Sequence, residues 1–327
     1  MKHLLLLTLM LLTSISGFAT SRYTLFPSFT PDVILPPHNP LENVECTPED
    51  AERVVTLLKN AKKERKSEHP IIYFAKQFLG LPYVGHTLES GDREHLIVNL
   101  HELDCTTFVE YVLALALCDE NNESTFDEFC LTLARIRYRQ GRLYDYTSRL
   151  HYFTWWAADN EALGLVRDIA PSMEQNKKLA PFTAVQTIDI NYMSKHPKLY
   201  KHLKDNQRFV KTINRYEQMS NGKQYRYIPK SALNGSRSSA LGAVHDGDII
   251  ALLTDSDGLD TRHIGIAYWQ GDKLYFIHAS SLYKKVLINS EPLYNYELKQ
   301  KKHTGIRVFR MTEGPRTAKT LPFIKKK

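Results

Sequence analysis

One cysteine in the sequence stands where a helix should begin, and this position favours a reactive thiol. Cys105 follows Asp104, a residue type that caps helix N-termini, and precedes the largely apolar residues 108–116. The first turn of a helix offers unpaired N–H groups and the positive end of the helix dipole, and both stabilise an anion. We therefore expect a lowered thiol pKa and a nucleophilic thiolate at Cys105. The alternative is that Cys105 is a small buried residue at a helix start.

A cysteine nucleophile needs a base, usually histidine, and a third group that orients the base. Among the 13 histidines, His263 begins one predicted strand and His278 ends the next. A hairpin loop at 270–271 places the two histidines directly opposite each other, and a loop at 271–272 places them diagonally on one face. A three-residue loop would put them on opposite faces. We predict that His263 is the base and His278 its partner; the alternative is two polar residues at strand ends.

The elements that must position these residues follow from capping residues and hydrophobic spacing. Thr47 as N-cap and Pro48 at the first helical position predict a helix to about residue 66. Further helices are predicted over about 70–80, from about 104, and over 126–138. Short runs separated by turn residues then predict an antiparallel sheet, with strands at 248–253, 264–269, 273–278, 285–288 and 305–310. Helices followed by strands are typical of the α+β class.

The composition indicates a folded protein with a modest excess of positive charge. The 327 residues are 43% hydrophobic and 11% aromatic, which excludes a disordered protein. The net charge of +7 favours acidic partners. Apart from residues 325–327 there is no basic stripe with interleaved aromatics, so we expect no nucleic-acid binding. Carboxylates and histidines with zinc-site spacing are not evident either, and we expect no metal and no cofactor.

The N-terminus has the pattern of a secretory signal peptide. A basic start is followed by residues 4–12, which are apolar apart from Thr8, and by small residues up to position 19. This run is shorter than the ~20 residues that a membrane-spanning helix needs, so we expect residues 1–19 to be a signal peptide. The alternative is a buried N-terminal helix. We therefore expect an exported, periplasmic protein with no stable membrane insertion and with a proline-rich extended arm over 20–48.

Five segments of the chain resemble, in the same order, the motifs of the NlpC-type cell-wall cysteine peptidases, which have a papain-like core. The segments are Leu-Gly-Leu-Pro-Tyr-Val-Gly at 79–85, Leu-Asp-Cys-Thr-Thr-Phe-Val at 103–109, Gly-Asp-Ile-Ile at 247–250, His-Ile-Gly-Ile at 263–266, and Phe-Ile-His-Ala-Ser at 276–280. The resemblance implies that Cys105 is the nucleophile, His263 the base and His278 the third member. It further implies that Tyr83 lines the site near the oxyanion.

Two departures from these peptidases point to a narrower branch. Thr106-Thr107 replaces the usual Ser-Gly after the cysteine, and the interval from Cys105 to His263 is far longer than in the minimal core. Residues 99–110 and 149–152 resemble a branch long described as a domain of unknown function and since identified as N-acetylmuramoyl-L-alanine amidases. These enzymes prefer fragments that end in an anhydro-muramic sugar. The resemblance thus implies cleavage between sugar and peptide, whereas typical NlpC-type enzymes cut within the peptide after D-glutamate.

The central insertion, about 139–245, holds aromatic and polar side chains suited to a sugar. Flat rings offer apolar walls and a few polar groups act as anchors, as in small-molecule sites generally. The predicted substrate-binding residues are Arg149, His151, Tyr152, Trp155 and Trp156, with Tyr227 as a weaker candidate. The alternative is that the segment around Trp155 and Trp156 is a core helix.

The sequence therefore predicts one α+β domain over 49–327, with a papain-like NlpC-type core, a helical N-terminal elaboration and the central insertion. The predicted activity is an N-acetylmuramoyl-L-alanine amidase with a Cys-His-His mechanism, acting on muropeptides as a monomer. The oxyanion would be held by the backbone N–H of Cys105 and by Tyr83. Two alternatives are a γ-D-glutamyl-diaminopimelate endopeptidase and a protein that binds cell-wall fragments without cutting them.

Overall fold

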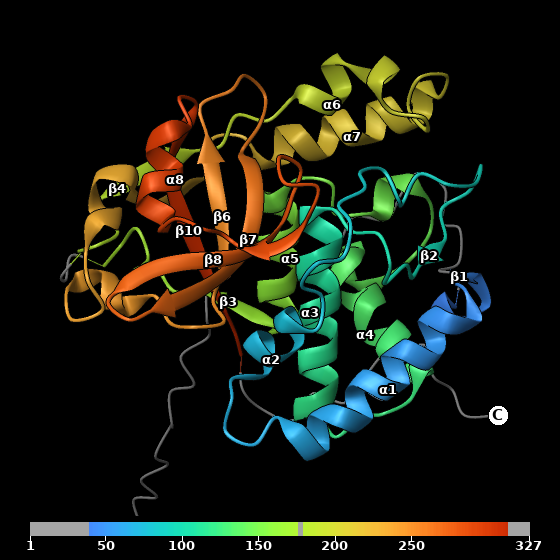
Figure 1. Cartoon of the computed structure of the whole chain (residues 1–327). Coiled ribbons are helices and arrows are strands. Elements are labelled where there is room, and N and C mark those ends of the chain that lie inside the picture. The colour runs from blue at the N-terminus through green and yellow to red at the C-terminus, as the bar shows by residue number, and fades with distance from the viewer. Residues whose placement is uncertain (1–38, 176–178, 313–327) are drawn as a thin grey trace, which may run out of the picture. The chain divides into compact units, whose positions relative to one another are not determined.

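The computed structural model describes residues 39–175 and 179–312 (Figure 1). The predicted signal peptide, residues 1–19, and residues 20–38 of the predicted arm lie outside the described residues. The last part of the predicted arm forms a short 3-10 helix, η1 (Pro40–Asn43), and strand β1 (Val44–Glu45). Strand β1 pairs in parallel with β2 (Leu96–Ile97), which anchors the start of the described chain beside the helices.

The four predicted N-terminal helices are confirmed, and their caps explain where they begin. Thr47 and Asp50 form a reciprocal capping box at the start of the first helix, a feature worth about 1 kcal/mol. Asp104 with Thr107 and Thr125 with Glu128 repeat this arrangement at the third and fourth helices. The four are α1 (Pro48–Glu64), α2 (Pro70–Lys76), α3 (Cys105–Glu120) and α4 (Phe126–Arg137).

Helix α3 is the central helix of this group because nearly all of its sides are buried. Residues 107–119 of α3 are all buried, and α1, α2 and α4 contact it. Figure 1 shows α3 upright, with α1 and α4 on one side of it and α2 on the side that faces the strands. Burial on every side fits an apolar helix without a polar stripe. The N-terminus of α3, which carries Cys105, points toward the end of the sheet.

Among the described residues, eight strands form one sheet in which every pairing is antiparallel. The order is β4-β5-β10-β6-β7-β8-β9, and β3 pairs with β10 beside this path. The strands are β3 (Val166–Asp168), β4 (Ala184–Thr187), β5 (Gln224–Pro229), β6 (Ile249–Thr254), β7 (Thr261–Gln270), β8 (Lys273–Ser280), β9 (Lys285–Ile288) and β10 (His303–Met311). The five predicted strands and the α+β class are thus confirmed.

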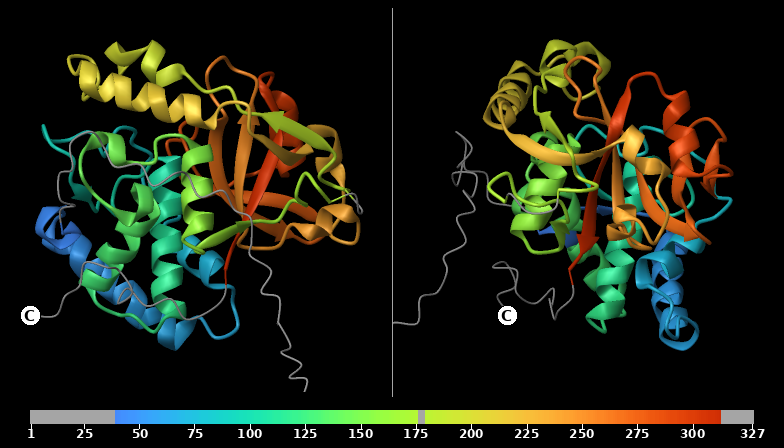
Figure 2. Two further views of the ribbon diagram at one scale, coloured as in Figure 1. Left: turned by 180° about the vertical axis from the view of Figure 1, so that it is seen from behind. Right: turned by 90° about the vertical axis from the view of Figure 1, so that its left-hand side faces the viewer.

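The sheet is covered on both faces, and alternation along each strand assigns its residues to one core or the other. Ile264 and Ile266 of β7 belong to the large core shared with the helices, which α2 and α3 join. Phe276 of β8 and Ala267 of β7 face a second core, closed by α8 (Leu293–Lys299) and the 3-10 helix η5 (Lys230–Asn234). Figure 2 shows helices α1 to α5 on one side of the strands and α8 on the other.

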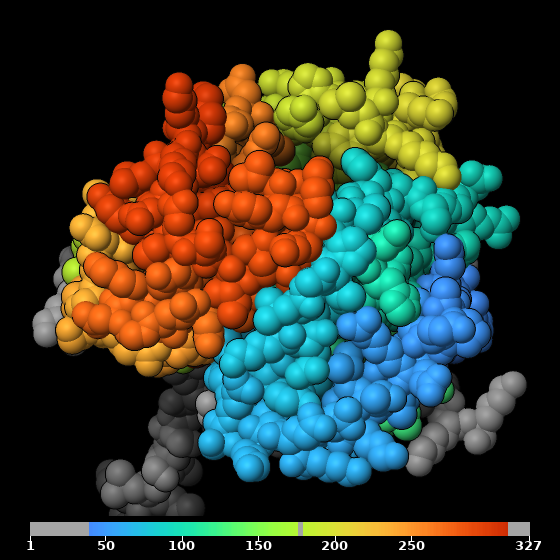
Figure 3. All heavy atoms as spheres, in the orientation of Figure 1, coloured from blue at the N-terminus to red at the C-terminus, as the bar shows by residue number. Residues whose placement is uncertain are grey.

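The insertion lengthens the sheet and adds helices at one end of it. Strands β4 and β5 come from the insertion and extend the sheet beyond β10. The helices of this region are α5 (Phe153–Ala162), α6 (Tyr192–Lys195) and α7 (Gln207–Ser220), with 3-10 helices η2 (Arg139–Gly141), η3 (Tyr146–Ser148), η4 (Pro197–Leu199) and η6 (Ala240–Ala243). In Figure 3 the yellow insertion, the orange strands and the cyan segment after α2 meet on one face.

Among the described residues, no helix is both long enough and apolar enough to span a bilayer. The longest helix, α1, carries charged residues at both ends and along its exposed side.

Candidate active site

A cavity of about 380 Å³ opens where the start of α3, the start of β7, the segment after α2 and the insertion come together. Residues from all four regions line it: Tyr83, Gly85, His86, Leu88, Glu89, Asp104, Cys105, Thr106, Glu110, Tyr146, Arg149, Leu150, His151, Tyr152, Phe153, Trp156, Met193, Tyr200, Leu259, Asp260, Thr261, Arg262, His263 and Ile264. Seven of the ten residues predicted from the sequence are in this lining. The exceptions are His278, Trp155 and Tyr227.

Cys105 occupies the first position of α3, as predicted, with Asp104 as N-cap. The Asp104 carboxylate accepts a hydrogen bond of 2.8 Å from the Thr107 N–H, and the Ile264 N–H donates to the Cys105 thiol. Burial, and then the negative charge of Asp104, nevertheless raise the thiol pKa to about 12. The expected lowering of the pKa is therefore wrong for the resting site. Desolvation disfavours the thiolate more than the helix N-terminus stabilises it.

A protonated thiol needs a base, and His263 stands one residue before the Ile264 N–H that the sulfur contacts. The pairing of β7 with β8 runs from Gln270↔Lys273 to Ile266↔Ile277, so the hairpin loop is 271–272. This is the second of the two registers that keep the histidines on one face. His263 Nε2 and His278 Nδ1 are 2.7 Å apart, with ring planes 86° to each other.

Both histidines are held in the neutral form. Burial lowers the pKa of His263 well below its usual 6.5, with smaller contributions from His278 and His303. Burial likewise lowers the pKa of His278 to about 4. Phe276 stacks on the His278 ring at 4.1 Å between centroids, which keeps water from that side. A neutral imidazole has one bare nitrogen, so His263 is able to accept a proton at neutral pH.

Gly265 of β7 stands where neighbouring atoms of β8 leave no room for a side chain. A Cβ at this position would lie 2.9 Å from the Ile277 carbonyl oxygen, 3.0 Å from the Phe276 ring and 3.2 Å from the His278 Cβ. The glycine of the His-Ile-Gly-Ile segment thus leaves room for the ring that supports His263.

Tyr83 lies on the wall beside the thiol, where two backbone contacts fix it. Its N–H donates to the Lys284 carbonyl at 2.9 Å, and it forms a bridge with Leu103, two residues before Cys105. Burial raises the Tyr83 pKa to about 12, with Cys105 and Asp104 as further causes. The phenol therefore keeps its proton and is a hydrogen-bond donor in the cavity.

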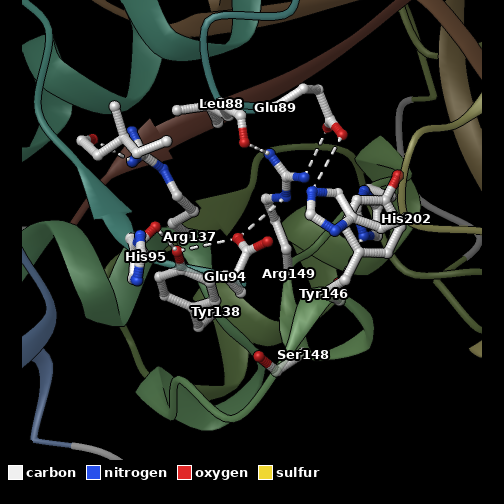
Figure 4. Close-up of polar contacts among 12 residues, drawn as sticks. Leu88, Glu89, Glu94, His95, Arg137, Tyr138, Tyr146, Ser148, Arg149 and His202 are labelled. Carbon is white, nitrogen blue, oxygen red and sulfur yellow. Dashed lines mark hydrogen bonds and ion pairs between the residues drawn. The ribbon is translucent and has the colours of Figure 1, made fainter. Parts of the chain in front are cut away.

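Arg149 also lines the cavity, but its charge is already paired (Figure 4). The guanidinium is 2.6 Å from a Glu89 carboxylate oxygen and 3.2 Å from Glu94, and it donates to the Leu88 carbonyl at 3.3 Å. Tyr138 donates to Glu94 at 3.1 Å from the other side. Because two carboxylates compensate its charge, Arg149 holds residues 88–94 against the insertion. The sequence alone did not indicate this structural role.

His151 and Tyr152 stand next to Arg149 in the lining. His151 Nε2 is 2.8 Å from the Tyr146 carbonyl, which only accepts, so this nitrogen carries the proton. Burial and then Arg149 lower the His151 pKa well below 6.5, so the ring is neutral. Its other nitrogen is then an acceptor. The Tyr152 hydroxyl donates to Glu217 at 2.7 Å, which leaves its ring as the surface nearest the cavity.

Both adjacent tryptophans are buried in the large core, and only Trp156 also lines the cavity. Trp156 lines the cavity and stacks on Phe153 at 5.4 Å. Trp155 is 1% exposed and its indole N–H donates to the Ser220 hydroxyl at 2.8 Å, so it is a core residue and not a ligand-binding one. Tyr227 lies on β5, opposite Ala184 of β4, and is not part of the lining. The positions of Trp155 and Tyr227 therefore do not support their predicted roles in substrate binding.

Three buried or half-buried acids in the lining, Glu89, Glu110 and Asp260, were not predicted from the sequence. Glu110, on α3, is buried and pairs with Arg137 at 2.7 Å. Asp260 is 4% exposed and accepts the Thr154 N–H of α5 at 2.6 Å, so it caps that helix across the cavity. An acid inside an otherwise apolar helix is a recognisable pattern and would have found Glu110. Glu89 and Asp260 lie in loops, where spacing gives no such pattern.

Among the described residues, no group of three or more His, Cys, Asp or Glu side chains has the arrangement of a metal site. Cys46, Cys118 and Cys130 are free thiols in the structure. Burial raises the pKa of Cys118 and Cys130, which leaves both as inert thiols at neutral pH.

Comparison with protein families gives one match, to the AmiA-like model described as N-acetylmuramoyl-L-alanine amidase-like, over residues 73–306. This range contains every residue of the cavity lining. No curated protein matches the chain.

Solved structures with similar folds come mainly from Bacteroides. The structure of an N-acetylmuramoyl-L-alanine amidase from Bacteroides uniformis is 40% identical, covering 74% of this chain and 97% of that one, with a TM-score of 0.67. A Bacteroides fragilis protein provisionally named a xylanase is also 40% identical, over 73% and 99% of the two chains, with a TM-score of 0.67. A Legionella pneumophila protein, 22% identical over 83% and 97% with a TM-score of 0.61, shows the same fold.

Proposed function

Because the chain belongs to the AmiA-like, N-acetylmuramoyl-L-alanine amidase-like family, we propose that it hydrolyses the amide bond between a muramic sugar and L-alanine in peptidoglycan fragments. The observation that carries the mechanism is the cavity that Cys105 and His263 share. Behind it, His263 and His278 are in contact at 2.7 Å. A nucleophile, a neutral base and a group that orients the base are the parts that acyl transfer requires.

We further propose that the core is the papain-like core of the NlpC-type enzymes. The five motifs of that superfamily fall at the start of α3, on β6, β7 and β8, and on the segment after α2. Four of the five contribute to the cavity or to the pair of histidines behind it. The fifth, on β6, lies next to β7 in the sheet. This arrangement supports the resemblance at the level of the site.

The first chemical step is attack of the Cys105 sulfur on the carbonyl carbon of the lactyl group. Since burial and Asp104 keep the thiol protonated, its proton passes to His263 as the sulfur–carbon bond forms. The oxyanion is held by the backbone N–H of Cys105 and by the Tyr83 hydroxyl. His263 then protonates the L-alanine nitrogen as the carbon–nitrogen bond breaks, which releases the peptide and leaves a thioester.

The second step releases the sugar. His263 takes a proton from water, the resulting hydroxide equivalent adds to the thioester carbon, and the sulfur leaves with the proton returned by His263. The products are a lactyl carboxylate on the sugar and a free amino group on L-alanine. Atoms balance with one water consumed and no cofactor.

The wall opposite Cys105 supports a sugar-bearing fragment as substrate. A volume of about 380 Å³ is at the small end of ligand sites and suits a fragment with few rings. Trp156 and Tyr152 offer ring surfaces, and His151 offers a neutral acceptor to a sugar hydroxyl or an amide N–H. We propose an anhydro-muropeptide as the preferred substrate, on the resemblance of residues 99–110 and 149–152 to the branch that prefers it. Peptidoglycan fragments are periplasmic material, which agrees with the predicted signal peptide, and we propose that the protein acts there as a monomer.

Product analysis tests the proposal. The purified protein is incubated with a defined anhydro-disaccharide peptide and the products are weighed by mass spectrometry. Free disaccharide and intact peptide are expected, and they must disappear in Cys105→Ala but persist in Cys46→Ala, a matched control at an exposed thiol. A stem peptide cut after D-glutamate would show an endopeptidase. Binding without turnover would show a non-catalytic binder, and release of xylose oligomers from xylan would show a glycosidase.

A further inference from the structure

Three polar side chains lie on a diagonal line across neighbouring strands behind the cavity. The β7–β8 register places His278 diagonally from His263 on one face. The β8–β9 register places Leu287 opposite His278, and the Asn289 N–H donates to the Phe276 carbonyl at 2.9 Å, which continues this pairing past β9. Asn289 is therefore diagonal to His278 on the same face, in the same direction that His278 is displaced from His263. Figure 1 shows β7 and β8 side by side in this part of the sheet.

The Glu291 carbonyl sets the orientation of the Asn289 amide. Asn289 is 4% exposed, and its Nδ2 donates to the Glu291 carbonyl at 2.8 Å. Since a carbonyl accepts only, the amide nitrogen belongs on the Glu291 side. The Asn289 Oδ1, a pure acceptor, is then the atom left for other partners.

His278 turns its second nitrogen away from His263 and into this buried region. Its side chain is 1% exposed, and the buried Asn289 side chain is a polar group that interacts with the ring there. The contact falls short of regular hydrogen-bond geometry at Nε2, so it is a loose one in the resting site. The interaction raises the His278 pKa against the larger lowering by burial.

Two proton arrangements satisfy the 2.7 Å contact between neutral rings. If His278 donates from Nδ1, its Nε2 is bare and meets Asn289 Oδ1, so two buried acceptors face each other. If His263 donates from Nε2, then His278 carries its proton on Nε2 and offers it to Asn289 Oδ1. Only the second arrangement turns a donor, and not a second acceptor, toward the Asn289 Oδ1. It also leaves the Nδ1 of His263 bare.

We propose that Asn289 is a positioning residue that selects the tautomer of His278 and, through it, the tautomer in which His263 accepts the Cys105 proton. The chain of contacts runs from the Glu291 carbonyl through Asn289 and His278 to His263. Its consequence for the reaction rests on the proposed role of His263 as the base, while the tautomers themselves do not depend on any substrate.

The first test needs neither a variant nor a substrate. NMR of the full chain labelled with ¹⁵N in histidine reports which nitrogen of each neutral ring carries the proton. The expected result at pH 7 is Nε2–H for both His263 and His278. An Nδ1–H tautomer at His278 would overturn the inference even if the protein proves to be an active amidase.

The second test uses two variants at one site. Asn289→Leu removes the acceptor at similar size, so kcat/KM should fall at least about tenfold, as happens when groups that orient catalytic side chains are removed. Asn289→Asp keeps an oxygen acceptor for His278 but loses the donor to the Glu291 carbonyl, so kcat/KM should lie between the values of Asn289→Leu and wild type. Asn295→Leu, on the exposed side of α8, is the control and should change nothing.

The variants also separate the inference from the proposed activity. In Asn289→Leu the His278 spectrum should show a population of the Nδ1–H tautomer, whatever the protein's substrate. A Leu variant with unchanged tautomers or wild-type kcat/KM contradicts the inference. If Asn289→Leu does not fold, the wild-type spectrum and the spectrum of Asn289→Asp decide the question alone. Absence of amidase activity with the expected tautomers would reject the proposed function and leave the Asn289 contact standing.

Discussion

The two walls of the cavity are built in different ways. One wall holds Cys105, His263 and, behind it, His278; each lies on or at the end of a regular element, at a position set by a cap or by strand register. The other wall holds Arg149, Glu89 and Asp260, which lie in segments with little regular structure. There, position is set by buried ion pairs and by a cap between residues far apart in sequence, such as Asp260 to Thr154.

The difference indicates which parts of the site tolerate change. Strand register and helix capping are each supported by many backbone hydrogen bonds, so the wall with Cys105 and His263, which we propose as the reacting wall, is fixed by the fold as a whole. The wall with Arg149, which we propose as the binding wall, depends on a few charge pairs whose loss leaves a buried charge without a partner. We therefore expect substitutions in the reacting wall to affect the rate and substitutions in the binding wall to affect stability and KM.

The largest effect should come from removing the nucleophile. Cys105→Ala should reduce kcat/KM at least about 10³-fold, because loss of one member of a catalytic unit removes the covalent route. The melting temperature should stay close to that of wild type, since alanine fits the same helix position. Cys46→Ala should keep full activity in the same muropeptide assay. Comparable losses in both variants would contradict the assignment.

The binding wall should respond most strongly to Arg149→Met. Removing the guanidinium leaves Glu89 and Glu94 facing each other in a buried site, which should lower the free energy of unfolding by about 3–5 kcal/mol. Urea unfolding measures this loss. The control is Arg208→Met, which removes an exposed pair with Asp145 at 3.8 Å and should change stability by less than about 1 kcal/mol. Equal losses of unfolding free energy in the two variants would contradict the expected difference between buried and exposed ion pairs.

The pH dependence of thiol reactivity tests the electrostatics of the reacting wall. Since the Cys105 pKa is raised to about 12, the thiolate fraction should rise about tenfold per pH unit from pH 6 to pH 10, without a plateau. Alkylation by iodoacetamide, followed on the Cys105 peptide by mass spectrometry, measures this slope. A plateau below pH 7 would instead show a thiolate already formed beside a protonated His263.

The smallest effects should distinguish the adjacent tryptophans. Trp155→Phe loses the hydrogen bond to Ser220 and leaves that hydroxyl without its donor, which should cost about 1–3 kcal/mol of stability with little change in KM. Trp156→Leu keeps an apolar side chain but removes the flat ring at the cavity, so KM should rise, and because Trp156 is 2% exposed the stability should fall as well. The reverse pattern would exchange their assignments to core and cavity.

The reacting wall could be predicted from the sequence because short-range rules place its residues. A capping residue locates Cys105, and the parity of the hairpin loop decides whether His263 and His278 share a face. The same rules located α1 to α4 and the strands from β6 onward. They left three hairpin loops open, two of which put the histidines on one face, and the structure has the loop at 271–272.

The binding wall could not be predicted in the same way, since its contacts join segments that no local pattern connects. Arg149 was predicted to be free for a substrate, whereas Glu89 and Glu94 compensate its charge. Adjacent tryptophans point to different sides of one helix, and spacing alone does not say which side is core. The raised thiol pKa was missed for a similar reason: helix position is local, but desolvation depends on everything that packs around the sulfur.

The central claim is that Cys105 carries the sugar part of the substrate as a thioester, and its mass tests this claim directly. Acid quenching during turnover of an anhydro-disaccharide peptide, followed by digestion and mass spectrometry, should show the peptide containing Cys105 with the disaccharide lactyl group attached. That adduct should contain no amino acid of the stem peptide. An adduct that includes L-alanine and D-glutamate, or one on a residue other than Cys105, would contradict the account.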